Sequence, residues 1–328
     1  AATQSQVNVL CNGQCTATAT VVASGGTPAY SYNWTPSGGN AATATGLCVG
    51  NYTCTITDAN GCTITRTFTI TQPPVLTATQ SQVNVLCNGQ CTGTATVVAS
   101  GGTPGYTYTW STVPVQYTAT ATGLCAGSYT VTIKDANNCT RTNTFIITQP
   151  PALTATQSQV NVLCNGQCTG TATVVASGGT PGYTYTWTTV PVQYTATATG
   201  LCAQTYSVTT TDANGCTNVA IAIVTEPTAI NINLVALSNV SCNGGADGHI
   251  TISVTGGTPG YTYDWIPVVG ASSTVTNLVA GTYQVTVTDL NGCSQVMNYT
   301  ITEPPPISLT TVTNLSTCGN SNGFVSVT

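Results

Sequence analysis

Residues 76–110 read LTATQSQVNVLCNGQCTGTATVVASGGTPGYTYTW, and residues 153–187 repeat this string without a change. The string contains the tripeptide CNG, which recurs along the chain at nearly constant spacings of 76, 77, 78 and 76 residues. Its cysteines are Cys11, Cys87, Cys164 and Cys242, followed by a degenerate CGN at Cys318. Common solenoid units are only about 20–50 residues long. The longer period therefore predicts that each repeat is a small domain of its own.

Prolines close each repeat and set the expected domain boundaries. We expect domains at residues 1–74, 75–151, 152–228 and 229–305, and the start of a fifth, incomplete repeat at 306–328. Paired prolines hold the backbone extended and act as semi-rigid spacers. Strands of about 8 residues rise roughly 3.3 Å per residue, so four such domains in series predict an elongated rod on the order of 150 Å.

Within each repeat the apolar residues follow the period of two that is typical of β-strands. Tyr106, Tyr108 and Trp110 alternate with Thr107 and Thr109. Threonine is the commonest residue, at 70 of 328, and its β-branched side chain suits a pleated, half-buried surface. The GGTP and DANG segments supply turn residues between the strands. The pattern predicts an all-β protein of tandem immunoglobulin-like antiparallel β-sandwich repeats.

The composition excludes several classes of function. Charged residues make up 3% of the chain, against about 25% in an ordinary soluble domain. Lys134, Arg66 and Arg141 are the only cations and cannot neutralise a phosphate backbone, so nucleic-acid binding is excluded. No apolar run approaches the roughly 20 residues of a membrane span. Sixteen cysteines indicate an oxidising compartment and hence a secreted or surface protein, and the start at Ala1 indicates a mature or excised form.

The order of the motifs resembles a known repeat family. CNG, GGTP, Tyr-x-Tyr-x-Trp, Gly-Leu, Asp-x-Asn-Gly-Cys and Thr-x-Pro-Pro follow one another as in the SprB-type repeat of giant cell-surface adhesins from gliding bacteria. The resemblance implies a secreted, filamentous adhesin at the bacterial cell surface, made of many tandem β-sandwiches and without catalytic residues.

Two further cysteines occur in each of the first three repeats, and both are absent from the fourth. Ala246 and Val279 occupy those two places. Because the cysteines are lost together, we expect them to be bonded to each other. Each bond would close a loop of about 33 residues and contribute about 3 kcal/mol in the loop-entropy account. The predicted pairs are Cys15–Cys48, Cys91–Cys125 and Cys168–Cys202.

The cysteines of the CNG and NGC segments are then expected to pair within a repeat. A bond needs Cα atoms within about 7 Å of each other, and the NGC turn is expected at the opposite end of the repeat from the first pair. The predicted bonds are Cys11–Cys62, Cys87–Cys139, Cys164–Cys216 and Cys242–Cys293. The alternative joins each NGC cysteine to the CNG cysteine of the next repeat, from Cys62–Cys87 through Cys293–Cys318.

Two cysteines are expected to be unpaired or intermolecular. Cys54 occupies the place of Val131, Val208 and Val285 in the other repeats, and is predicted to be a buried free thiol that packs as a small apolar side chain. The alternative is a bond between chains, with Cys318 as the partner.

The chain lacks the residues of an enzyme site. His249 is the only histidine and the sequence shows no paired carboxylates, so we expect neither a catalytic triad nor a two-carboxylate hydrolase site. The Asp-x-Asn segments each offer one acid, whereas calcium takes six to eight oxygens, and we expect hairpin turns there instead. These aspartates are Asp58, Asp135, Asp212 and Asp289. The sequence predicts no catalytic, metal-binding or cofactor-binding residue.

Uncharged, threonine-rich strands such as residues 16–20 leave sheet edges without the charges that normally keep chains apart. We therefore predict a structural subunit or segment of an extracellular, disulfide-stabilised filamentous adhesin or fibre. Its expected partner is itself, either as a homopolymer or as a longer chain of the same repeats. One alternative is a carbohydrate-binding adhesin module that stacks a surface polysaccharide on exposed aromatic rings. The candidates are Tyr117, Tyr194 and the Tyr-x-Tyr-x-Trp runs, and the alternation of the runs favours a place in the core for them. Another is an ice- or mineral-binding array, which requires threonine rows that continue across neighbouring strands.

Overall fold

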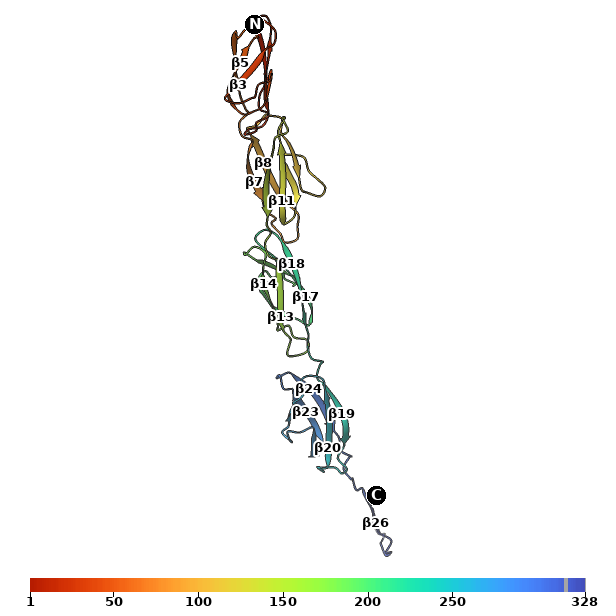
Figure 1. The fold of residues 1–328 in the computed structure, drawn as a ribbon. Helices are drawn as coiled ribbons and strands as arrows, with labels where there is room; N and C mark the ends of the chain where they lie inside the picture. The colour runs from red at the N-terminus through yellow and green to blue at the C-terminus, as the bar shows by residue number, and fades with distance from the viewer. Residues whose placement is uncertain (316–317, 328) are drawn as a thin grey trace. The chain divides into compact units, whose positions relative to one another are not determined.

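The computed structural model describes residues 1–315 and 318–327. These residues contain β-strands and no helix, and all the strand pairs are antiparallel (Figure 1). The described chain divides into two compact units. One holds residues 1–153 with 178–181 and 212–216, and the other holds the rest. The predicted all-β, immunoglobulin-like architecture is confirmed.

The first unit begins with a sandwich of two three-stranded sheets, which have the strand orders β1-β2-β4 and β3-β5-β6. Their strands are β1 (Ala2–Val7), β2 (Ala17–Ala23), β3 (Ser31–Thr35), β4 (Thr43–Leu47), β5 (Gly50–Thr57) and β6 (Thr63–Ile70). A second sandwich repeats the arrangement in the orders β7-β8-β10 and β9-β11-β12. Its strands are β7 (Thr77–Val83), β8 (Gly93–Ser100), β9 (Thr107–Trp110), β10 (Thr120–Leu124), β11 (Gly127–Lys134) and β12 (Thr140–Ile147).

The second unit holds the strands of two more sandwiches. One has the orders β13-β14-β16 and β15-β17-β18, and the other has β19-β20-β22 and β21-β23-β24. The first set is β13 (Thr154–Val160), β14 (Gly170–Ser177), β15 (Thr184–Trp187), β16 (Thr197–Leu201), β17 (Gln204–Thr211) and β18 (Thr217–Val224). The second set is β19 (Asn231–Ser238), β20 (Gly248–Thr255), β21 (Thr262–Ile266), β22 (Thr274–Leu278), β23 (Gly281–Thr288) and β24 (Ser294–Ile301). A hairpin of β25 (Thr311–Asn314) and β26 (Phe324–Val327) follows.

Each sandwich has one apolar core, to which both of its sheets contribute. In the first sandwich Val21 of β2 belongs to the same buried cluster as Trp34 of β3, Ile56 of β5 and Phe68 of β6. Side chains alternate between core and solvent along these strands because successive Cβ atoms point to opposite faces. The threonines take the outward positions, so the period of two in the sequence becomes a half-buried sheet.

A tryptophan fills the centre of each core. Trp110 is buried, and its indole Nε1 donates a hydrogen bond to the carbonyl of Thr118 at 2.8 Å. Its ring packs at a tilt against Phe145, with centroids 5.3 Å apart. The hydrogen bond satisfies the single polar atom that an indole brings into a core. The equivalent residues Trp34, Trp187 and Trp265 are also buried.

Candidate functional site: disulfide junctions between consecutive repeats

The CNG turn lies at the end of the sandwich where the chain leaves the repeat. Asn12 donates a side-chain hydrogen bond to the carbonyl of Pro73 at 2.9 Å. The backbone amide of Gly13 donates to the side-chain oxygen of Gln72 at 2.8 Å. Both acceptors belong to the segment that follows the last strand of the repeat, so the turn is fastened to the linker. The same asparagine bond recurs as Asn88–Pro150, Asn165–Pro227 and Asn243–Pro304.

The NGC turn, which reads Asn-Asn-Cys in the second repeat, lies at the other end and is organised by its aspartate. One carboxylate oxygen of Asp58 accepts the backbone amides of Asn60 and Cys62, both at 2.9 Å. The other oxygen accepts the amide of Thr27 at 3.1 Å. The carboxylate therefore bonds backbone amides of its own turn and of a neighbouring loop, which is the hairpin turn expected from Asp-x-Asn.

A glycine lets this carboxylate approach the neighbouring loop. Gly102 has a φ of 59°, and a Cβ on it would lie 2.5 Å from a side-chain oxygen of Asp135. Both the backbone conformation and the space exclude a larger residue there. The second glycine of GGTP is therefore required because the turn between β11 and β12 brings the carboxylate of Asp135 against it.

The backbone amides also set the acidity of these carboxyl groups. The amide of Cys62, followed by that of Thr27, lowers the pKa of Asp58. The amide of Thr180 is the largest cause of the lowered pKa of Asp212, and the amide of Thr258 acts in the same way on Asp289. Hydrogen bonds to the ionised form favour it over the neutral form, so the turns are most stable with their aspartates charged.

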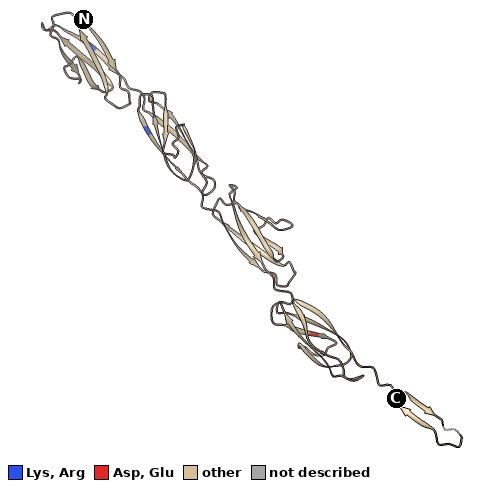
Figure 2. Ribbon diagram, turned by 90° about the vertical axis from the view of Figure 1, so that its right-hand side faces the viewer, with Lys and Arg blue, Asp and Glu red and all other residues tan. Residues whose placement is uncertain are grey.

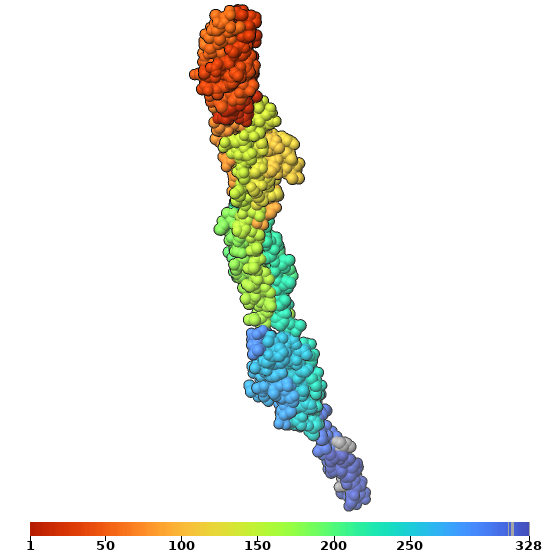
Figure 3. Space-filling model, viewed as in Figure 1, coloured from red at the N-terminus to blue at the C-terminus, as the bar shows by residue number. Residues whose placement is uncertain are grey.

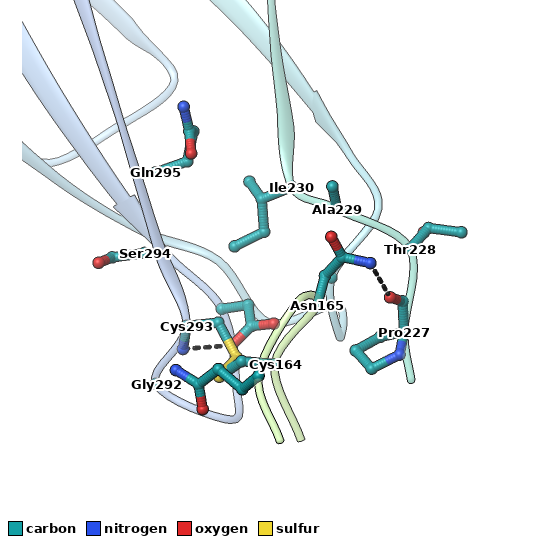
Figure 4. A pocket seen from close by; sticks show the side chains of 13 residues that line it. Cys164, Asn165, Pro227, Thr228, Ala229, Ile230, Gly292, Cys293, Ser294 and Gln295 are labelled. Carbon is teal, nitrogen blue, oxygen red and sulfur yellow. Dashed lines mark hydrogen bonds between the residues drawn. A yellow bond between two sulfur atoms is a disulfide. The ribbon is translucent and has the colours of Figure 1, made fainter. Parts of the chain in front are cut away.

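Disulfides join the CNG turn of one repeat to the NGC turn of the next. The Cα atoms of the three pairs lie 5.6, 5.6 and 5.5 Å apart, within the usual range for a disulfide. The pairs are Cys11–Cys139, Cys87–Cys216 and Cys164–Cys293, with sequence separations of 128, 129 and 129 residues. Figure 4 shows the third of them beside the bond between Asn165 and Pro227.

The expected pairing within a repeat is wrong. The predicted bonds Cys11–Cys62, Cys87–Cys139, Cys164–Cys216 and Cys242–Cys293 do not form, and neither does the alternative series from Cys62–Cys87 through Cys293–Cys318. The physical reason is distance, because the CNG and NGC turns lie at opposite ends of a sandwich. Strands of seven or eight residues separate the two ends by about 25 Å, far more than a disulfide spans.

A hydrogen bond accompanies each of these disulfides. The side-chain amide of Asn137 donates to the carbonyl of Leu10 at 3.0 Å and to the hydroxyl of Thr103 at 2.8 Å. The first bond reaches the preceding repeat, and the second holds the asparagine in its own repeat. The equivalent bonds run from Asn214 to Leu86 and from Asn291 to Leu163. Sequence reasoning assigned these asparagines to the turn alone and missed their contact with the preceding repeat.

A second set of disulfides closes loops within a repeat. The structure bonds Cys15 to Cys48, the two positions that are lost together in the fourth repeat. The amide and the carbonyl of Cys48 both bond the hydroxyl of Tyr52, at 3.2 Å each. The other bonds of this set are Cys91–Cys125 and Cys168–Cys202.

Four cysteines are free in the part of the chain that the structure describes. Cys54 is fully buried in the first core, and burial raises the pKa of its thiol, only partly offset by a hydrogen bond to the backbone of Asn33. It packs as a small apolar side chain. Cys318 is exposed. Cys62 and Cys242, which were expected to be bonded, are also free and exposed.

The aromatic candidates separate into buried and exposed groups. Tyr106 and Tyr108 are partly buried against the second core. Tyr117 and Tyr194 are each 68% exposed, on equivalent loops of the second and third repeats. The loop that carries Tyr117, coloured yellow, projects from its sandwich in Figures 1 and 3. These two rings are therefore accessible to a ligand, whereas the Tyr-x-Tyr-x-Trp run is core.

Threonine rows continue across strands in only part of the protein. In the first repeat Thr53 of β5 lies between Thr35 of β3 and Thr67 of β6. In the third repeat the corresponding outer positions of β18 are Val219 and Ile221. Apolar residues therefore interrupt the polar rows that a regular ice- or mineral-binding face requires.

The charged side chains are few and lie apart from one another along the chain. Figure 2 shows isolated blue and red segments on an otherwise uncharged ribbon. No cluster of three His, Cys, Asp or Glu side chains that could hold a metal ion occurs among the described residues. His249 lies on β20, half-buried and opposite Thr276 of β22.

Residues 1–315 and 318–327 hold no helix that could cross a membrane. The chemistry that the junctions offer is the making and breaking of disulfides.

Tandem antiparallel sandwiches of immunoglobulin type, fastened by disulfides, define the class of this protein. The SprB repeat family matches the chain four times in tandem, at residues 3–39, 79–115, 156–192 and 234–270. Four segments of the chain, in tandem, are therefore similar to the SprB repeat.

Solved structures with tandem domains resemble the chain at low identity. The three N-terminal domains of the highly immunogenic outer capsid protein of bacteriophage RB49 are 13% identical, over 70% of this chain and 99% of that one, with a TM-score of 0.33. A tetra-tandem repeat from the extending region of a large adhesion protein is 14% identical, over 93% and 100%, with a TM-score of 0.28. Invasin, a bacterial integrin-binding protein, is 14% identical, over 92% and 79%, with a TM-score of 0.31. No curated protein matches the chain.

Proposed function

We propose that this chain is a segment of an extracellular adhesin at the bacterial cell surface, built as a disulfide-stabilised filament of tandem repeats. The observation that carries the proposal is the set of disulfides between consecutive repeats. The proposed domains are residues 1–74, 75–151, 152–228 and 229–305, with the start of a fifth repeat at 306–328.

The disulfides support both the compartment and the mechanical role. Disulfides persist in oxidising, extracellular environments. A bond such as Cys11–Cys139 joins two consecutive repeats directly, in addition to the peptide linker between them. Tension along the chain therefore cannot pull the two turns apart without breaking this covalent bond.

The surface supports association between filaments. Charged residues are 3% of the chain, so little electrostatic repulsion opposes contact between copies. The outer face of β5 and β6 is lined by hydroxyl side chains such as Thr53, Thr55 and Thr65, which can hydrogen-bond a neighbouring surface without an ionic partner.

Electron microscopy of the oxidised protein tests the filament. We expect rods on the order of 150 Å, estimated from four repeats whose strands rise about 3.3 Å per residue, and lateral bundles as the concentration rises. Antibodies raised against the chain should label the surface of the intact bacterium. Compact particles that stay monomeric at high concentration, or labelling confined to the cell interior, would rule the function out.

A carbohydrate-binding role is the second candidate, because two equivalent loops present an exposed aromatic ring. Tyr117 and Tyr194 are 68% exposed, and Val113 and Val190 in the same loops are 99% exposed. An exposed ring combines an apolar face with a polar tip, which suits the face of a sugar. Binding to a glycan array should be lost in the Tyr117→Ala, Tyr194→Ala double variant and kept in Val268→Ala, which alters the equivalent loop of the fourth repeat. Binding that is equal in both variants would reject this role.

A further inference from the structure

Two of the junction disulfides open a short covalent route through the chain. The cysteines that they join are 128 and 129 residues apart in the sequence. The bonds Cys11–Cys139 and Cys164–Cys293 leave a route made of residues 1–11, 139–164 and 293–328. We propose that tension along the chain is carried by this route, so that the repeats cannot be pulled out into an extended chain while the junctions are oxidised. The proposal rests on the filament proposed above and specifies what limits its stretching.

The middle segment of this route is already close to its full length in the folded protein. Residues 139–164 contain β12 and β13, which are extended strands of 8 and 7 residues. The linker between the strands holds Pro150 and Pro151, and paired prolines keep the backbone extended. A strand rises about 3.3 Å per residue, near the limit of roughly 3.3–3.6 Å for a stretched chain. The segment therefore has little length to release under tension.

The bypassed residues release no length at all when they unfold. Tension favours unfolding in proportion to the extension that unfolding adds. The Cα atoms of Cys11 and Cys139 are 5.6 Å apart, and the bond keeps them at that separation whether residues 12–138 are folded or not. The second bond does the same for residues 165–292, with its Cα atoms 5.5 Å apart. Tension therefore does no work on the bypassed residues, and their folding equilibrium does not depend on the force.

The remaining junction disulfide gives a second route, which alternates with the first. Cys87–Cys216 bypasses residues 88–215, and these include the middle segment of the first route. Between the second and third repeats the first route is the peptide linker, and the second route is this disulfide. At the junctions before and after, the first route is the disulfide instead. The loss of one junction disulfide therefore lengthens the shortest route but does not open the whole chain.

The disulfides within the repeats lie off the first route. Cys91–Cys125 closes a loop inside the bypassed residues 12–138. Removing this bond leaves the route unchanged, because both of its cysteines are already bypassed. Removing Cys11–Cys139 takes away the same number of cysteines and disulfides but destroys the route. The two kinds of disulfide therefore provide a matched pair of variants.

Pulling single molecules by tags on the two ends of the chain tests the proposal. A stretched chain reaches about 3.4 Å per residue, so the oxidised chain should stop at about 240 Å, from about 70 residues, and the chain reduced with dithiothreitol should reach about 1,100 Å, from 328. The variant Cys11→Ser, Cys139→Ser should stop at about 370 Å, because the shortest route through the other disulfides holds about 110 residues. The control variant Cys91→Ser, Cys125→Ser should stop where the unsubstituted chain does.

Three extension results overturn the proposal. They are an oxidised chain that extends as far as the reduced one, a junction variant that extends no further than the unsubstituted chain, and a control variant that extends further. A peptide map of the oxidised protein that lacks either bond of the route overturns it as well. Each leaves the filament function to be judged by microscopy and surface labelling. Conversely, a chain that stops at the short extension but is absent from the cell surface would reject the adhesin function and leave the covalent route standing.

Discussion

Cys11 and Cys139 are bonded with their Cα atoms 5.6 Å apart, although 128 residues separate them in the sequence. The bond joins the CNG turn of the first repeat to the NGC turn of the second, the same two repeats that the linker with Pro73 and Pro74 connects. Two covalent connections therefore cross this junction, and the peptide linker is only one of them.

Cutting that linker should leave the protein in one piece. With a protease site inserted between Pro74 and Val75 and then cleaved, we expect a single band without reductant and two fragments after reduction. Cys11→Ser is the control, in which cleavage alone should release the first repeat. Release of that repeat from the oxidised, unsubstituted protein would show that the bond between Cys11 and Cys139 does not form. The measurement is electrophoresis with and without reductant.

The junction also separates the features that the sequence predicts from those that it does not. The alternation around Trp110 and the turn residues predict the sandwich, because both depend on contacts local to one repeat. The joint loss of cysteines at Ala246 and Val279 points to the bonds within repeats for the same reason. The pairing of Cys11 with Cys139 depends on how one repeat follows another. The opposite placement of the two turns was available from the strand order, but which neighbour each turn meets is decided by the path of the linker.

The fourth repeat should accept the disulfide that it lacks. Ala246 and Val279 occupy the places of Cys15 and Cys48 in the first repeat. The double substitution Ala246→Cys, Val279→Cys should form a bond that closes a loop of about 33 residues and raises the free energy of unfolding by about 3 kcal/mol. Denaturant unfolding, followed by the fluorescence of Trp265 with the other three tryptophans replaced by phenylalanine, measures it. Ala246→Cys alone is the control, and equal stability in both would contradict the prediction.

Stability should fall in acid because of the aspartates in the NGC turns. Backbone amides lower the pKa of Asp58, Asp212 and Asp289 in the folded chain. A carboxyl whose pKa is lower folded than unfolded stabilises the fold above its unfolded value, about 3.9, and this contribution is lost as the pH falls through the folded pKa. The melting temperature should therefore be level from pH 7 to about 5 and decrease below about 4.

A substitution separates this effect from general acid denaturation. Asp58→Ala should lower the melting temperature of the first repeat at pH 7 and flatten its decrease in acid. Asp264→Asn, on the exposed face of β21, should leave both unchanged. A melting temperature that stays level down to pH 2 in the unsubstituted chain would disprove the role of the turns.

Thr210 is a polar residue buried in the apolar core of the third repeat, and replacing it should stabilise that repeat. Its side chain is fully buried, and its hydroxyl has no hydrogen-bond partner among the described residues. The equivalent positions in the other repeats are Ile56, Ile133 and Val287, all buried in their cores. An unsatisfied buried hydroxyl costs about 1–3 kcal/mol, so Thr210→Val, which keeps the shape, should raise the free energy of unfolding by about 1 kcal/mol in urea. Thr209→Val, on the outward side of the same strand, should change it by less than about 0.5 kcal/mol. If Thr210→Val destabilises the repeat, a partner for the hydroxyl exists in solution, because valine removes nothing else from that site.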